Sequence, residues 1–296
     1  MPAYQLSSDV LVIGYGSLMS GLGLESFGQL RVRGAARVAL QNTRRGFGKL
    51  SQHGDRFAMV LEADYLHQPI TGTLLAADAP PTHSPEGVLL LLQPSDLARL
   101  CDREGYSSGA LQRLREEARL KRQALGDYLW SLYVDTELNL ALFRQRLFKL
   151  VGYTSPHYVP HPVRVDTDHI AITFLAPGRE GSGSERVVPV RVRTGNTGML
   201  TMVEAWQRKP NRTQLDYFLA CLLGGVHGVN VLDLLEPLAG DRGLGQRVRE
   251  ALGKELRHEV ARFLATTGMD TTGYWEAFGP PTQALRRGGL EEFLRG

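Results

Sequence analysis

Residues 10–20 read VLVIGYGSLMS, so a run of apolar residues leads directly into a glycine turn. Val10–Ile13 predicts a buried strand, because consecutive apolar side chains suit a strand that is covered on both faces. The strand ends in GYGSL at Gly14–Leu18. Two glycines at this point indicate a tight turn whose backbone can come close to a ligand or to another element.

Common phosphate and hydrolase motifs come near this turn but do not match it. The dinucleotide fingerprint needs a third glycine where Met19 stands, and the next predicted strand ends in ALQN at 39–42, without an acidic residue. A nucleophile elbow would need glycines in place of Tyr15 and Met19, and the Walker ending is absent. A plain structural turn and a turn that holds some other anion both remain open.

The bulk composition is that of a globular protein. Of the 296 residues, 43% are hydrophobic and 22% charged, and the net charge of +3 gives no electrostatic argument for a nucleic-acid partner. The apolar run at 88–92 is too short to cross a membrane, and residues 1–9 lack the pattern of a signal peptide. Cys101 and Cys221 lie in apolar helical patterns and are expected as reduced core thiols. We therefore expect a cytoplasmic protein without nucleic-acid or membrane partners, and the oligomeric state stays open.

Periodicity predicts strands first, then helices, then strands and helices again. The predicted strands are 10–13, 31–40 with a bulge at Gly34, 57–62, 70–76, 87–92, 163–165, 169–175 and 187–193. The predicted helices are 96–103 with Ser95 as N-cap, two or three within 108–151, one from Asn211 or Thr213 to about Gly224, and a tail from about Leu244. Loops are expected at 78–86, 152–162 and 178–184, with His157 and His161 as loop histidines. This order favours an α+β fold over a doubly wound sheet.

One acidic residue stands out in the predicted helix at 96–103. Leu97, Leu100, Cys101 and Glu104 are spaced at i, i+3, i+4 and i+7, so they share one face. Because the apolar members mark this face as buried, Glu104 is expected to point inward, where a carboxylate can serve as a general base. The alternative is an ordinary glutamate paired with an arginine of the same helix, such as Arg103 or Arg99.

An ordered set of short motifs resembles the gamma-glutamyl cyclotransferase family. The set comprises YGSL at 15–18, RGFG at 45–48, ITGTL at 70–74, REGY at 103–106, YVPHPVRV at 158–165, AITF at 171–174, and PNR followed by DYF and GG between 210 and 225. The resemblance implies a mixed, partly closed β-barrel flanked by helices. It implies a cyclotransferase-like domain at 1–240 with a helical insertion at about 108–152 and a second insertion at about 178–205. Residues 241–296 would then be a helical C-terminal extension packed on that domain.

The resemblance also implies a reaction without metal or cofactor. In this family the α-amine of a γ-glutamyl compound attacks its own γ-carbonyl and releases 5-oxoproline, which assigns Glu104 as the general acid/base. The residues implied to bind the small-molecule γ-glutamyl substrate are Tyr15, Gly16, Ser17, Leu18, Tyr106 and Tyr158. Arg45 is a weaker candidate for a substrate carboxylate and is expected to face solvent. Phe174 stands where many members carry tyrosine, and a non-catalytic γ-glutamyl-binding or scaffold protein of the same fold is the alternative.

Overall fold

A computed structural model describes residues 9–28, 30–50, 57–76, 78–80, 82–153, 158–176, 178–180, 187–189, 212–224, 242–279, 281 and 294–295. Its centre is a closed barrel with the strand order β1-β6-β2-β5-β7-β8. These strands are β1 (Val10–Gly14), β2 (Val32–Gln41), β5 (Thr71–Leu75), β6 (Glu86–Leu92), β7 (Val159–Val165) and β8 (His169–Leu175). The predicted α+β class is confirmed, but the barrel is closed rather than partly closed.

The ring closes where the first strand meets β8. On one side β1 pairs antiparallel with β6, and on the other it pairs parallel with β8 at Val12 and Ile172. The hydroxyl of Thr173 adds a 3.2 Å hydrogen bond to the carbonyl of Ile13. Strand β1 thus has a neighbour on each edge. It is also mostly buried, as the apolar run predicted.

A second sheet lies beside the barrel and consists of β3 (Thr43–Leu50) and β4 (Phe57–Ala63), paired antiparallel. Sequence patterning missed β3, because its charges and glycines hide any apolar alternation. Phe47 of β3 packs edge-on against Phe218, with ring centroids 4.8 Å apart. This contact fixes helix α6 (Arg212–Gly224) against the sheet. Two short strands, β9 (Gly178–Glu180) and β10 (Val187–Pro189), form a further pair.

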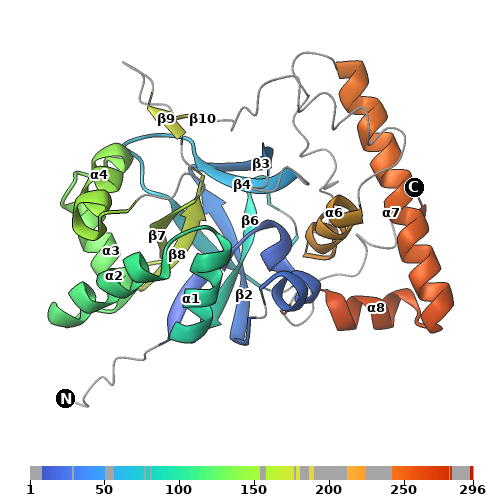
Figure 1. Cartoon of the computed structure of the whole chain (residues 1–296), viewed down its shortest axis with the longest axis horizontal. Helices are drawn as coiled ribbons and strands as arrows, with labels where there is room; N and C mark the ends of the chain where they lie inside the picture. Colours follow the sequence, from blue (N-terminus) through green and yellow to red (C-terminus); the bar gives the residue numbers. More distant parts are fainter. Residues whose placement is uncertain are drawn as a thin grey trace.

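The helices flank the barrel in two groups (Figure 1). Helices α2 (Ser108–Leu120), α3 (Leu125–Val134) and α4 (Leu140–Val151) lie on one side, so the predicted insertion contains three helices. On the other side are α6, α7 (Arg242–Thr267) and α8 (Thr271–Phe278), which share an apolar cluster that contains Leu223, Val260, Tyr274 and Trp275. The helical tail is therefore confirmed within its described part. No helix among the described residues combines the length and the apolar character that a membrane span requires.

Three predicted boundaries were wrong. Helix α1 (Pro94–Arg103) begins after Gln93 rather than Ser95, because Pro94 at its first position has the helical φ angle built in. Strand β7 begins at Val159, so part of the expected 152–162 loop is strand. Its prolines are tolerated because β7 pairs with β5 only at Arg164 and Val165. Residues 178–180 are strand instead of loop, whereas 157, 181–186 and 190–193 lie outside the described residues.

The revised course of β7 buries a histidine. His161 is 2% exposed and packs edge-on against Tyr133 and Phe143, with ring centroids 4.7 and 5.6 Å away. Neither ring nitrogen has a hydrogen-bond partner among the described residues. Burial, with a further contribution from Arg144, lowers the pKa of His161 to about 3. The ring is therefore neutral where the helical insertion meets the barrel.

This histidine makes stability depend on pH. The folded protein resists protonation of His161, whereas the unfolded chain takes up the proton near a pKa of about 6.5. Its contribution to stability is complete above that pH and is lost as the pH falls toward 3. Between pH 7.5 and 5 the loss is about 2 kcal/mol. We expect His161→Phe to remove this loss of stability between pH 7.5 and pH 5, as measured by urea unfolding at the two pH values. If the variant keeps the same pH dependence, His161 is not its source.

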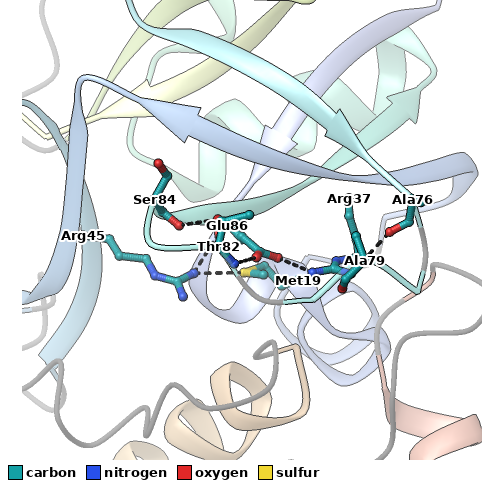
Figure 2. Close-up of polar contacts among 8 residues, drawn as sticks. All are labelled: Met19, Arg37, Arg45, Ala76, Ala79, Thr82, Ser84 and Glu86. Atoms are coloured by element: carbon teal, nitrogen blue, oxygen red, sulfur yellow. Dashed lines mark hydrogen bonds and ion pairs between the residues drawn. The ribbon is translucent and has the colours of Figure 1, made fainter.

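A buried ion pair holds the end of the 76–86 connection to the barrel wall (Figure 2). Arg37 of β2 and Glu86 of β6 are 2.8 Å apart, and their side chains are 2% and 4% exposed. Glu86 also accepts a 2.9 Å hydrogen bond from the N–H of Thr82, and Arg37 donates at 2.7 Å to the carbonyl of Ala79. The described part of the loop predicted at 78–86 is thus held by charged groups inside the protein, and its last residue, Glu86, belongs to β6.

Removing one partner of this pair should be costly. Glu86→Gln leaves the Arg37 charge without its counter-charge in a buried place, and we expect a loss of about 3–5 kcal/mol in the free energy of unfolding. Arg33→Gln is the matched control, because the Arg33–Asp9 pair has the same type of contact at 3.0 Å but a half-exposed arginine. It should cost no more than about 1 kcal/mol. Equal losses for the two variants would show that burial does not strengthen the Arg37–Glu86 pair.

Candidate functional site

The turn after β1 forms one wall of the candidate site. Residues Gly16–Met19 make one turn of 3-10 helix, and Gly16 has a φ of +63°, in the region that favours glycine. A Cβ at Gly16 would also lie 3.0 Å from Cβ of Met59 in β4. The Tyr15 hydroxyl donates to the carbonyl of Phe174 in β8. The backbone of the turn is therefore held from two neighbouring strands.

Glu104 approaches this turn from the end of α1. It is the C-cap residue, and Gly105 follows with a φ of +73°, which ends the helix. Leu97 and Leu100 of the same face are fully buried, and the Glu104 side chain is 13% exposed. The carboxylate lies mostly inside the protein, as the helical spacing predicted.

Arg103 connects the glycine turn to Glu104. Its Nη2 donates to Oγ of Ser17 at 2.7 Å, and its Nε lies 3.7 Å from Oε1 of Glu104. Nη1 is buried and has no hydrogen-bond partner in the described part of the chain. Both interpretations of Glu104 thus find support, since it faces the turn and is also close to an arginine. Arg99 instead approaches Asp96, at 3.7 Å.

Three buried tyrosines, Tyr15, Tyr158 and Tyr217, lie near Arg103 and Glu104. Tyr158 donates at 2.9 Å to the carbonyl of Met59, and Tyr217 accepts at 3.0 Å from the N–H of the same residue. Burial raises the pKa of Tyr15, Tyr158 and Tyr217, and the negative charge of Glu104 raises all three further. The three phenols therefore remain protonated and close enough to Glu104 to sense its charge.

Two other predicted residues have packing roles in this structure. Tyr106 lies edge-on to Tyr153, with centroids 5.6 Å apart. Burial raises the pKa of its hydroxyl, with smaller contributions from Cys101 and Tyr153. Leu18 is buried, and its Cβ would lie 2.8 Å from a Cβ placed on Gly14. Substrate contact by Tyr106 or by Leu18 stays a prediction.

Sequence reasoning missed Tyr217 and the bridging role of Arg103. Tyr217 belongs to helix α6, which was predicted, but nothing in its spacing showed that its hydroxyl would meet β4. The sequence feature that could have indicated Tyr217 was its place in the DYF motif at 216–218, which contributed to the family resemblance. Arg103 was considered as a partner of Glu104, but its hydrogen bond to Ser17 joins residues 86 positions apart.

Arg45 does not face solvent as expected. Its Nη1 donates at 2.8 Å to the carbonyl of Glu86 and lies 3.5 Å from Sδ of Met19 (Figure 2). Burial lowers the pKa of its guanidinium, against the opposing effects of Cys221 and Glu86. Arg45 thus joins the second sheet to the barrel and to the last residue of the turn.

No family model, curated protein or solved structure matches this chain. These comparisons identify no family, and the likeness to gamma-glutamyl cyclotransferases remains a resemblance of short motifs. Within the described residues, no group of three His, Cys, Asp or Glu side chains is placed to hold a metal ion.

The geometry of the turn can be tested through its glycine. We expect Gly16→Ala to lower the free energy of unfolding by about 1–3 kcal/mol, because alanine is strained at this φ and its Cβ presses on Met59. Gly34→Ala is the control, since the nearest atom to its added Cβ is 4.0 Å away. Urea unfolding of both variants measures the effect. A Gly16→Ala protein as stable as Gly34→Ala would mean that the turn adapts to a side chain.

Proposed function

We propose that this protein is a gamma-glutamyl cyclotransferase that releases 5-oxoproline from a small γ-glutamyl compound. The observation that carries the proposal is the meeting of the glycine turn with Glu104, linked by Arg103 through contacts of 2.7 and 3.7 Å. A turn with close backbone access and a largely buried carboxylate are the two components that this reaction requires.

In the proposed reaction Glu104 transfers the proton. The substrate α-amine is an ammonium near neutral pH, so it must lose a proton before its nitrogen attacks the γ-carbonyl carbon. The new N–C bond closes the five-membered ring, and the old amide C–N bond then breaks. Glu104 accepts a proton from the attacking nitrogen and returns it to the leaving nitrogen. The attacking nitrogen loses a second proton as it becomes the lactam N–H, and the released amine takes up one proton from water to become an ammonium. Because both reacting groups belong to one molecule, little positioning of a second reactant is required.

The turn would hold the negative charge that develops on the γ-carbonyl oxygen. Backbone N–H groups of Gly16, Ser17 and Leu18 are the proposed donors, since fixed donors near a developing oxyanion lower the barrier without a metal. Gly16 allows the close approach that this role requires. The oxygen of Ser17 already accepts from Arg103, which leaves the Ser17 hydroxyl proton for an acceptor on the substrate.

Arg103 is the proposed partner of the substrate α-carboxylate. Its contact with Glu104 is long for an ion pair, and an incoming carboxylate can form the shorter, two-pronged contact that guanidinium groups favour. When Arg103 turns to the substrate, the Glu104 carboxylate is released from its contact with the guanidinium and can turn to the substrate amine. Substrate binding would thus prepare the base for its task.

A non-catalytic γ-glutamyl-binding or scaffold protein is the second candidate. The observation in its favour is that Arg103 already contacts both Ser17 and Glu104, as in a site that has become structural. Thermal stabilisation by γ-glutamyl ligands without product would identify a binding protein. Free glutamate in place of 5-oxoproline would instead identify a hydrolase that uses water as the nucleophile.

The proton-transfer role is tested by Glu104→Gln. We expect at least a 100-fold loss in the rate of 5-oxoproline formation with little change in stability, because the amide cannot carry the proton. Asp102→Asn is the matched control, since Asp102 is an exposed acidic residue in the last turn of the same helix. It should retain full activity. Product is measured chromatographically with a panel of γ-glutamyl amino acids, γ-glutamyl amines and glutathione.

Two results would contradict the proposal. If no member of the panel yields 5-oxoproline with the unmodified protein, the enzyme assignment is wrong. If Glu104→Gln is fully active, the reaction stands but its base is another group.

A further inference from the structure

A pocket of about 390 Å³ lies within the helical insertion. Its lining comes from the end of α2, from α3 and from α4, so it is formed entirely by the elements on one side of the barrel (Figure 1). Helix α3 contributes Tyr128, Leu132 and Asp135, which share one face at i, i+4 and i+7. The volume falls within the range of pockets that bind small molecules.

Positive charge dominates the lining. Lys121, Arg146 and Lys149 face one acidic side chain, Asp135, whose carboxylate lies 3.2 Å from Nη2 of Arg146. Neither lysine has an ion-pair partner among the residues that the structure describes. The lining thus has three cations and one carboxylate, and a second acidic side chain, Glu117 of α2, lies close enough to raise the pKa of the lining residue Tyr128. Positive charge remains in excess.

The remaining lining offers a hydrogen-bond donor and an apolar floor. Burial raises the pKa of Tyr128, so its hydroxyl stays protonated at neutral pH. Leu132 is buried beneath the pocket and Leu150 is half-buried at its side. Such a combination suits a ligand with one strongly charged end and one apolar end.

We propose that this pocket binds a small molecule that carries a phosphate group. The excess of positive charge suits a phosphate group, whose oxygens can accept from Lys121, Arg146 and Lys149 together. The apolar part of the ligand would contact Leu132 and Leu150. This binding site is separate from the proposed reaction and does not depend on it.

The competing explanation is that each lysine only compensates a helix dipole. Lys121 is the C-cap of α2 and Lys149 lies in the last turn of α4, where positive charge is favourable. That effect would account for a lysine on each helix but would produce no saturable binding of a dianion. Direct titration separates the two explanations.

The test is calorimetric titration of the full chain with inorganic phosphate and with phenyl phosphate, at constant ionic strength. We expect saturable binding of both, with phenyl phosphate the tighter because its ring contacts the apolar floor. The double variant Lys121→Gln/Lys149→Gln should weaken phenyl phosphate at least tenfold. Lys254→Gln, which removes an exposed lysine of α7 outside the pocket, should change the Kd less than twofold.

Three outcomes would overturn the proposal. The first is that the unmodified protein shows no saturable binding of either phosphate compound. The second is an unchanged Kd in the double variant, once circular dichroism has verified its fold. The third is that Lys254→Gln weakens binding as much as the double variant does. The last result would show that only the overall charge of the protein matters.

Discussion

The pairing of β1 with β8 is the contact on which the other features depend. It places Val12 beside Ile172 and allows Thr173 to bond the carbonyl of Ile13, so the ring is complete. The same neighbouring strand receives the hydroxyl of Tyr15 just beyond the end of β1. The glycine turn therefore has a fixed position at one end of the barrel, and α1 can reach it with Arg103 and Glu104. Without closure the turn would lose its hydrogen bond to β8.

Two arginine–glutamate pairs near the barrel, Arg37–Glu86 and Arg103–Glu104, differ in character. Arg37 and Glu86 are close, nearly inaccessible and each bonded to further backbone groups, which is typical of a pair that serves the structure. Arg103 and Glu104 are farther apart and retain some exposure to solvent. A loose pair can exchange partners at a smaller cost than a tight one, because less interaction energy is lost when its members separate. This difference supports the second pair as part of the proposed site.

Local pattern was sufficient for most of the barrel and for the orientation of Glu104, because apolar runs and helical spacing are properties of neighbouring residues. It failed for β3, where glycines and charges conceal the strand. It also failed for the start of β7, where Pro160 resembles a loop residue but faces a stretch that β5 does not pair. The contacts of Ser17 with Arg103 and of Met59 with Tyr217 join distant segments, and they depend on how α1 and α6 dock. No spacing rule can provide such information.

The closed ring also constrains how the chain can fold. Its first strand finds its last neighbour about 160 residues later, beyond the three helices of the insertion. Contacts at this sequence separation form slowly, whereas the insertion can form early from local contacts. During synthesis the apolar edge of β1 must therefore wait, unpaired on one side, until β8 leaves the ribosome. In that interval it is exposed to other nascent chains, so this barrel should fold with higher yield when a chaperone shields its N-terminal strand.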